Sequence, residues 1–360
     1  MKVWQVVRPT QGGLKSYIRS LLPALRNRGL DVVLVGPEPL GAETMLWCPI
    51  GDRILPGREL AAIRRLRQLA RRVAPDVVHA HGTKAALLAR LALRGRYPLV
   101  YSLHGLPRSG FHIRAAERLL SRWTGLYLAP TAAVAQRAAA AWGLKPEQVM
   151  ISPFGPDPAR LHGLLKARRT PPCPHSPVRV ALVARLVPEK GLDVLLEAMD
   201  LLADRPGIPA FRVKVAGDGP LMDWFRSRTA EPRRSAPIDI LGQLPPEETD
   251  ELLLSSQIFV LPSRAEALGL AALEAMAAGC AVVVSDAGGL PESAGQEAAL
   301  SFVSGEPGSL ADRLEVLLRN PDLREDMGRR ARRIAGSRFP FEKHTSQLDA
   351  AYRELVGHGR

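Results

Sequence analysis

The sequence predicts an α/β protein built from two Rossmann-like, doubly wound domains that face each other across a cleft. Three observations lead to this prediction. Continuous apolar runs, typical of strands buried on both faces of a parallel sheet, alternate with helical segments along the chain. A basic, proline-rich stretch at residues 166–177 interrupts this alternation, which then begins again. The 360 residues exceed what one ordinary core needs and suit two.

The expected strands are divided evenly between the two halves of the chain. In the first half they cover residues 3–7, 32–35, 77–79, 99–103 and 126–129, with helices expected at 14–26 and 59–73. In the second half they cover residues 178–183, 211–216, 238–241, 258–261 and 281–284, with helices at 191–202 and 270–278. Ligands of such sheets bind beyond the carboxyl ends of the strands.

The proline-rich stretch is the expected domain boundary, because proline breaks helices and favours extended linkers. We expect an N-terminal domain over residues 1–170, a linker over 171–177 and a C-terminal domain over 178–338. The final segment, 339–360, is expected to form a helix that returns to the N-terminal domain. Its apolar residues make one helical stripe: Leu348, Ala351, Tyr352 and Leu355.

The cysteine content and the hydropathy pattern bear on location. The three cysteines are far apart and odd in number, which argues against a disulfide framework or a structural zinc site and fits a reducing compartment. The N-terminus lacks the apolar run of a signal peptide, and no stretch has the length of a spanning helix. We expect a cytoplasmic protein, with peripheral contact to the inner face of the cell membrane left open.

The positive charge is concentrated in the first half of the chain. Residues 1–176 contain 27 Lys and Arg against 9 Asp and Glu, whereas residues 177–360 contain 22 against 27. This asymmetry indicates an anionic partner for the first half, and nucleic acid, anionic lipid or a phosphorylated acceptor would each fit.

Two basic helical segments contribute to this excess. One carries Arg114, Arg118 and Arg122 at four-residue spacing, and the other carries five arginines between residues 64 and 72. A basic amphipathic helix suits docking to an anionic membrane surface. A solvated, arginine-rich face is the alternative, and the sequence leaves both open.

The most informative motif lies between residues 263 and 289. It follows an expected buried strand and places Glu266 in a loop before Gly269, where glycine lets the backbone approach a ligand closely. A helix beginning near Leu270 would offer free N–H groups to a phosphate. Glu274, about one turn inside, could accept hydrogen bonds from both hydroxyls of a ribose. The alternative is that Glu274 is a solvated helix residue and Glu266 a loop charge.

The pattern Glu266-x7-Glu274, followed by Ala-Met-Ala-x-Gly and a strand, resembles the retaining glycosyltransferases of family 4, which have the GT-B fold. Further matches occur in the same order at residues 12–13, 76–81, 103–105, 184–191, 216–220 and 241–244. The resemblance implies transfer of a sugar from a nucleotide-diphosphate sugar, of UDP or GDP type, to a hydroxyl of a glycan or a lipid-linked acceptor. It implies no protein-bound cofactor.

The resemblance also implies roles for individual residues. Arg185 and Lys190 would clamp the donor diphosphate, and two cations there would stabilise the charge of the leaving group. Glu274 would hold the ribose and Glu266 the donor sugar. His104 would donate a hydrogen bond to the donor sugar. The remaining donor contacts would come from the backbone of Gly12, Gly13, Gly217, Gly242, Leu244, Gly269 and Leu270.

Each of these roles has a simpler alternative. Arg185 and Lys190 could form a surface pair, and His104 could close its strand by bonding to backbone. His79 and His81 resemble a metal pair, but a third ligand at suitable spacing is missing, which favours a structural role.

The chain contains no Asp-x-Asp pair of the kind that holds a metal ion on a donor diphosphate. With Arg185 and Lys190 in its place, we expect metal-independent transfer. No carboxylate stands out as a nucleophile. We therefore favour a front-face reaction in which a donor phosphate oxygen takes the proton of the acceptor. Ala267-Leu268 stand where the family usually has Gly-Phe, so the identity of the sugar stays open.

Two other functions are compatible with parts of the sequence. A nucleotide-sugar epimerase has the same architecture but needs no acceptor, and the Arg185, Lys190 and paired-glutamate pattern favours transfer over it. A basic nucleic-acid-binding protein would explain the charge. We see no helix-turn-helix, zinc-finger or aromatic RNA-binding motif, so we expect no nucleic acid partner.

Overall fold

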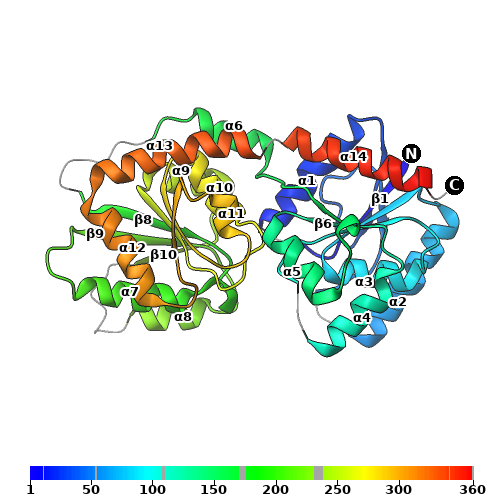
Figure 1. Ribbon diagram of the computed structural model, residues 1–360, viewed down its shortest axis with the longest axis horizontal. Helices are drawn as coiled ribbons and strands as arrows, with labels where there is room; N and C mark the ends of the chain where they lie inside the picture. Colours follow the sequence, from blue (N-terminus) through cyan, green and yellow to red (C-terminus); the bar gives the residue numbers. More distant parts are fainter. Residues whose placement is uncertain are drawn as a thin grey trace. The chain divides into compact units, whose positions relative to one another are not determined.

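The structure is a computed structural model that describes residues 1–10, 12–52, 55–107, 110–169, 176–230, 238–339 and 341–358. The chain divides into two compact units. Unit 1 comprises Met1–Asp157 together with Pro340–Arg360, and unit 2 comprises Pro158–Phe339. Each unit is a parallel sheet with helices on both faces, so the expected pair of doubly wound α/β domains is confirmed (Figure 1).

Unit 1 contains a seven-stranded parallel sheet in the order β3-β2-β1-β4-β5-β6-β7. The order reverses between β1 and β4, and such a reversal is where ligands bind in doubly wound sheets. The strands are β1 (Lys2–Val6), β2 (Asp31–Gly36), β3 (Met45–Trp47), β4 (Val77–His81), β5 (Leu99–Ser102), β6 (Leu126–Ala129) and β7 (Val149–Ile151).

The helices of unit 1 cover the two faces of this sheet unequally (Figure 1). One face carries α1 (Gly12–Arg26) and α14 (Phe341–His358), which contact each other, and α14 also contacts β4. The opposite face carries α2 (Pro56–Arg72), α3 (Thr83–Leu93), α4 (Phe111–Ser121) and α5 (Ala132–Trp142), and a 3-10 turn, η1 (Pro146–Gln148), precedes β7. The last helix of the chain thus completes the first unit, and it buries Leu348 and Tyr352 there.

Unit 2 contains a six-stranded parallel sheet in the order β10-β9-β8-β11-β12-β13, with the reversal between β8 and β11. Its core is almost entirely aliphatic. The strands are β8 (Val178–Val183), β9 (Phe211–Ala216), β10 (Ile238–Gly242), β11 (Ile258–Leu261), β12 (Ala281–Ser285) and β13 (Ala299–Phe302).

The faces of this second sheet are also covered by helices. In Figure 1 one face carries α7 (Leu192–Ala203), α8 (Met222–Thr229) and α12 (Pro307–Arg319), and the other carries α9 (Pro246–Ser255), α10 (Leu270–Ala278) and α13 (Pro321–Arg338). The shorter elements are α6 (Pro158–Lys166), the 3-10 turn η2 (Pro188–Lys190) and α11 (Leu290–Ala294).

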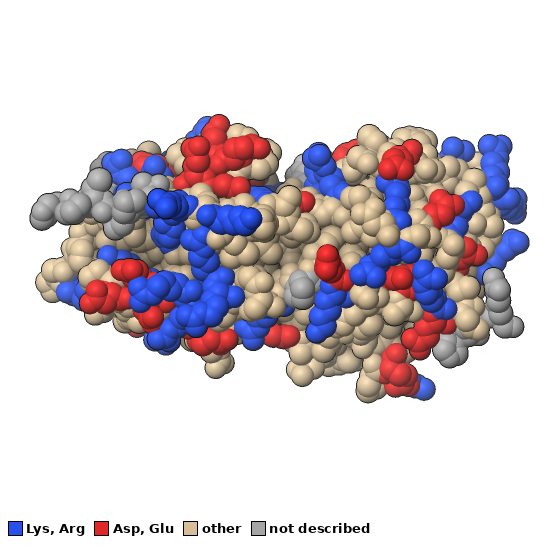
Figure 2. Space-filling model, turned by 90° about the horizontal axis from the view of Figure 1, so that it is seen from above, with Lys and Arg blue, Asp and Glu red and all other residues tan. Residues whose placement is uncertain are grey.

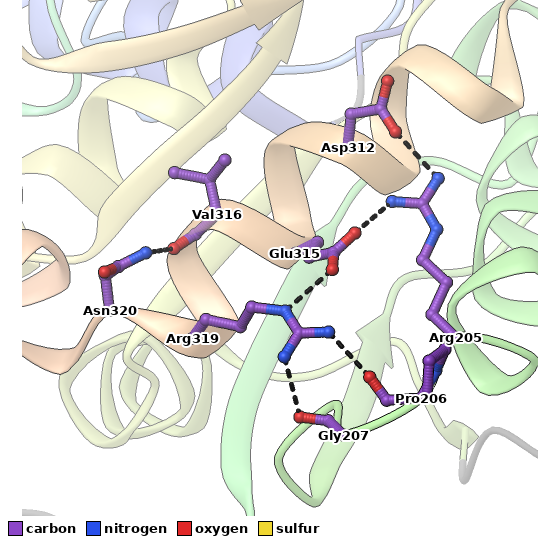
Figure 3. Close-up of polar contacts among 8 residues, drawn as sticks. All are labelled: Arg205, Pro206, Gly207, Asp312, Glu315, Val316, Arg319 and Asn320. Atoms are coloured by element: carbon purple, nitrogen blue, oxygen red, sulfur yellow. Dashed lines mark hydrogen bonds and ion pairs between the residues drawn. The ribbon is translucent and has the colours of Figure 1, made fainter.

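An ionic network joins the loop after α7 to α12 (Figure 3). Arg205 pairs with Asp312 and Glu315, at 2.7 and 2.5 Å. Arg319 pairs with the same Glu315 at 2.7 Å and donates to the carbonyl of Gly207. The loop is therefore fastened to the helix by side chains that lie at the surface.

The domain boundary differs from the prediction. We placed it after residue 170, whereas unit 2 already begins at Pro158. The reason is packing: α6 contacts α10 and α13, and the Arg332 guanidinium donates to the carbonyls of Leu164 and Ala167 at 3.2 and 2.6 Å. Most of the predicted linker, residues 171–175, lies outside the described residues.

None of the helices in the described ranges combines the length and the hydrophobicity needed to cross a bilayer.

Candidate functional site

Most of the predicted site residues follow strands at or near the order reversal of each sheet. In unit 2, Arg185 and Lys190 come after β8, and Glu266 comes after β11, its neighbour across the reversal. In unit 1, Gly12 and Gly13 begin α1 after β1, and His104 comes after β5. Since parallel strands end at one edge, each set gathers at the carboxyl edge of its sheet.

Lys190 and Glu266, predicted to hold different parts of the donor, form an ion pair with each other. A glycine makes this possible. The turn η2 ends at Gly191, which has φ 66°, and a Cβ at that position would overlap the carbonyl oxygen of Pro262 at the end of β11. The loop after β8 is thereby pressed against the loop after β11.

Arg264 strengthens the contact between these two loops. Its backbone N–H donates to the carbonyl of Glu189 at 2.7 Å, and its guanidinium makes two hydrogen bonds of 2.6 Å to Asp193. This bidentate pair lowers the pKa of the Asp193 carboxyl and raises that of Arg264. The position of Lys190 is therefore fixed from both sides.

Arg185 is exposed and makes no side-chain hydrogen bond or ion pair with any residue in the described part of the chain. The alternative of an Arg185–Lys190 surface pair finds no support, because two like charges would gain nothing by it and Lys190 has Glu266 as its counter-ion. A diphosphate arriving here would meet one uncommitted guanidinium and one ammonium that can exchange partners.

Glu274 lies in α10, where its side chain is only 12% exposed. The Arg160 guanidinium, from α6, donates to it at 2.7 Å and to Asp250 of α9 at 2.7 Å. Burial opposes the charge on Arg160, but the two carboxylates outweigh this effect and raise its pKa. The alternative in which Glu274 is a solvated helix residue is therefore wrong: it is a buried carboxylate held by a cation.

Glycines bring three neighbouring strand ends into backbone contact. Gly217, after β9, has φ 142°, and a Cβ there would overlap the carbonyl oxygen of Ala184 after β8. Its N–H donates to the carbonyl of Gly242 at 2.7 Å. Gly242 and half-buried Leu244 therefore lie at the same edge, although β9 separates them from β8. Gly269, with φ 79°, caps the N-terminus of α10, which Leu270 begins.

In unit 1, His104 is part of a hydrogen-bonded chain that runs into the core. Its Nε2 lies 3.0 Å from His81 Nδ1, and His81 Nε2 lies 2.7 Å from Gln5 Oε1. Gln5 Nε2 donates to the hydroxyl of Tyr352 at 3.3 Å, which in turn lies 2.6 Å from His79 Nδ1. The alternative in which His104 only closes its strand through backbone is therefore wrong, since its partner is a side chain.

The three histidines of this buried network, His79, His81 and His104, are held neutral. Burial lowers the pKa of His104 to about 3, with neighbouring His344 and Arg8 adding to the effect. Burial also places the pKa values of His79 and His81 well below 6.5. Both nitrogens of His79 are committed, to Tyr352 and to Ser102 at 2.7 Å. Among the described residues no three metal-ligating side chains cluster.

Several residues of the site were not foreseen from the sequence. Arg160 carried no signal, because its partners Asp250 and Glu274 are 90 and 114 residues away. Gln5 did carry one: it is a polar residue inside an otherwise apolar strand and is fully buried. Tyr352 belonged to the apolar stripe of the last helix, where its hydroxyl gave no separate indication.

Comparison with known proteins agrees with this geometry. Residues 11–160 match the family described as Glycosyltransferase Family 4, and residues 166–334 match the family described as Glycosyl transferases group 1. The chain is 28% identical over 353 residues to sulfoquinovosyl transferase SQD2 of Arabidopsis thaliana, a match covering 89% of this chain and 66% of the relative. It is 27% identical over 386 residues to a glycogen synthase of Mycobacterium tuberculosis, covering 95% and 91%.

Solved structures share the fold. Anabaena Alr3699/HepE, crystallised in complex with UDP-glucose, superposes with a TM-score of 0.76 at 18% identity, covering 98% of this chain and 100% of that one. These matches favour sugar transfer over the epimerase and nucleic-acid alternatives. Two family matches that together span nearly the whole chain, and a fold shared from end to end, establish that the protein belongs to the family 4 glycosyltransferases, with the GT-B fold.

Proposed function

We propose that the protein transfers a hexosyl group from a nucleotide-diphosphate sugar to an acceptor hydroxyl, with retention of configuration and without a metal ion. The observation that carries the proposal is the arrangement at the order reversal of unit 2. There, uncommitted Arg185 and the Lys190–Glu266 pair follow β8 and β11, and the buried Glu274 lies in the helix that begins next to them.

In this proposal each side chain meets a different part of the donor. Arg185 and Lys190 contact the diphosphate, and the free N–H groups at the start of α10 contribute further donors. Glu266, released when Lys190 turns to the phosphates, accepts hydrogen bonds from the sugar. Glu274 accepts from the ribose hydroxyls while the hydrogen bond from Arg160 holds its carboxylate in place.

The reaction that fits these groups is a front-face displacement. The bond between the anomeric carbon and the diphosphate oxygen breaks, and the acceptor oxygen bonds to the same carbon on the same face. The acceptor proton passes to a phosphate oxygen, and the nucleoside diphosphate leaves. Arg185 and Lys190 stabilise the negative charge that develops on the leaving group, which is where positioned cations accelerate such a step most.

A thermal-shift screen with UDP-, GDP- and ADP-sugars tests the donor assignment. A ligand that binds only the folded protein at a hundred times its Kd adds about 2.7 kcal/mol to the free energy of unfolding. Because the Anabaena relative was crystallised with UDP-glucose, we expect the UDP series to raise the melting temperature. Arg185→Ala should reduce the shift. If no nucleotide sugar stabilises the wild type, the proposed function is wrong.

We further propose that the acceptor is a glycan or a lipid-linked hydroxyl and that α4 docks unit 1 on an anionic membrane surface. Phe111 and Leu119 of this helix are 81% and 56% exposed, beside exposed Arg114 and Arg118. Glu117 is turned inward, where it is buried against Arg90 at 2.6 and 2.9 Å. The outer face of the helix is thus apolar and basic, as interfacial helices are.

Liposome co-sedimentation tests this surface. Binding should increase with the fraction of anionic lipid, and Phe111→Ser should weaken it, whereas equal binding to neutral vesicles would contradict the proposal. The α14 side of unit 1 provides the comparison, because there the basic side chains are broken up by acidic and neutral ones (Figure 2). Removing a basic residue from that side, with Arg353→Gln, should leave vesicle binding unchanged; Arg353 pairs with Asp349 at 2.8 Å.

A further inference from the structure

We propose that Gln5 and His81 fix the proton of His104 on Nε2, so that Nδ1 of His104 is an open acceptor that selects a ligand bearing a hydroxyl over one bearing an anion at that position. The tautomer follows from unit 1 alone. The identity of the ligand as a sugar rests on the proposed function.

Gln5 is a buried link of this hydrogen-bonded network, between Tyr352 and His81. Its amide nitrogen donates to the hydroxyl of Tyr352, so its amide oxygen faces His81 Nε2 at 2.7 Å. An amide oxygen can only accept a hydrogen bond, and therefore Nε2 of His81 carries a proton.

The proton on His81 in turn determines the proton of His104. His81 is 1% exposed and neutral, so it has a single N–H, and its Nδ1 must be an acceptor. The group facing that acceptor is His104 Nε2, at 3.0 Å, which must be the donor. Since His104 is also neutral, its Nδ1 keeps a lone pair and no proton.

This Nδ1 is buried and has no hydrogen-bond partner among the described residues. A buried acceptor without a partner is costly, and in a binding site the ligand usually supplies the missing group. The ring cannot turn away easily, because Tyr17, Phe154 and His81 lie 5.5, 5.5 and 5.3 Å from it, centroid to centroid. The atom lies just beyond β5, at the edge where doubly wound sheets bind ligands.

The open lone pair imposes a chemical preference. A hydroxyl can donate to it, whereas a carboxylate or a sulfonate has only acceptor oxygens and would place its lone pairs against that of Nδ1, with no proton between them. This reverses the direction expected from the sequence, in which His104 was to donate. The protein should therefore favour a donor or acceptor sugar with a free hydroxyl against His104 over one with an acid group at that position.

Histidine tautomers can be read directly by long-range 1H–15N correlation spectra of the whole chain labelled at histidine. His104 is assigned by the signals lost in His104→Gln. We expect a protonated Nε2 and a bare Nδ1, unchanged in the control His112→Gln on exposed α4. Rotating the Gln5 amide by half a turn would reverse every donor in the chain, so a proton found on Nδ1 of His104 overturns the proposal.

Two variants test whether Gln5 is the positioning residue. Gln5→Met removes both the oxygen and the NH2 of the amide and keeps a side chain of similar length. We expect His104 to populate both tautomers in this variant. Tyr352→Phe removes only the hydroxyl that orients the amide, and it covers the case in which Gln5→Met does not fold. If the variants that fold leave His104 in the wild-type tautomer, Gln5 does not set it.

A binding measurement then tests the positioning role of Gln5 independently of the proposed sugar transfer. With UDP-glucose as the probe, Gln5→Met should weaken affinity about tenfold, the effect of one buried hydrogen bond lost or misdirected. In the Gln5→Met variant, the affinity for a probe whose sugar carries a carboxylate should rise relative to the affinity for UDP-glucose. Absence of UDP-glucose binding by the wild type would count against the proposed function, while the spectra would still decide the tautomer.

Discussion

The strands that flank the order reversal are built differently in the two units. In unit 1, β1 and β4 carry Gln5, His79 and His81 in the interior, at most 1% exposed. In unit 2, the core residues of β8 and β11 are apolar, and the ionic groups of the site begin only after the strands end. One unit therefore presents its site through a buried, neutral network, and the other through charges on loops.

This difference indicates different tasks. A buried hydrogen-bonded network holds its members in one arrangement, because breaking any of its bonds leaves a further polar group without a partner. Loop charges such as Lys190 and Glu266 can exchange one partner for another at little cost. Unit 1 is thus suited to read the shape and hydrogen-bond pattern of a ligand, and unit 2 to take up a diphosphate and release it after reaction.

The largest expected effect is acid sensitivity of unit 1. Burial lowers the pKa of His104 to about 3 and that of His344 to about 4, against about 6.5 in the unfolded chain. The folded state therefore binds fewer protons below pH 6.5, so this stability is complete above pH 6.5 and is lost as the pH falls. Protonation of these two groups together should lower the free energy of unfolding by about 5 kcal/mol between pH 7 and pH 4.5.

Urea unfolding followed by tryptophan fluorescence measures this loss, because four of the five tryptophans, Trp4, Trp47, Trp123 and Trp142, belong to unit 1. His344→Gln should reduce the dependence on pH by about one proton, and His112→Gln should leave it unchanged. A stability of unit 1 that stays constant between pH 7 and 5 would show that the network is not neutral.

The next effect concerns the buried ion pair of unit 2. Arg160→Leu leaves the Glu274 carboxylate, 12% exposed, without its guanidinium. Removing one partner from a buried pair costs several kcal/mol, and because both side chains keep some solvent contact we expect about 3 kcal/mol. Chemical denaturation monitored by circular dichroism measures it. The matched control is Arg329→Leu, from an exposed pair in the same unit, which should change stability by less than about 0.5 kcal/mol.

A smaller effect is expected for Lys190→Ala. It removes one charge-assisted hydrogen bond to the diphosphate and leaves Glu266 to repel it, so the free energy of UDP binding should weaken by about 2 kcal/mol. Calorimetric titration with UDP measures it, and the loss should be smaller in Lys190→Ala/Glu266→Ala, because that variant lacks the repelling carboxylate. Lys145→Ala, exposed in unit 1, serves as the control. Equal affinity for UDP in all variants would show that Lys190 does not contact the diphosphate.

The smallest effect is expected for the surface network in Figure 3. Arg205→Ala removes both of its ion pairs, with Asp312 and Glu315, yet exposed pairs contribute little because water screens them. We expect the melting temperature to fall by about 2 °C or less and UDP binding to stay unchanged. A large loss would mean that unit 2 depends on its surface charges more than on its aliphatic core.

Much of the fold could be predicted from the sequence. The ten expected strands all occur, with ends shifted by two residues or fewer, since buried parallel strands give continuous apolar runs. The strands that were missed, β3, β7 and β13, lie at sheet edges and are only three or four residues long. β3 and β7 are apolar throughout, but so short a run cannot be told from an apolar stretch of a loop or helix. The boundary was misplaced because proline marks where a helix breaks but not which core the preceding helix joins.

The candidate site could be predicted only where its residues are close in sequence. The spacing of Glu266 and Glu274 indicated a shared helix and loop, whereas the role of Lys190 was implied by the resemblance to family 4. The pairing of Arg160 with Glu274, and of Tyr352 with Gln5 across 347 residues, depends on tertiary packing that no local pattern encodes.

The most direct test of the account is the affinity of the nucleotide sugar for Glu274→Ala, measured by calorimetric titration with the donor that the thermal-shift screen identifies. We predict that the wild type and the control Glu251→Ala, exposed on α9, bind alike, and that Glu274→Ala loses affinity by about a hundredfold, the effect of two charge-assisted hydrogen bonds to the ribose. Wild-type affinity in a folded Glu274→Ala would contradict the proposed donor site.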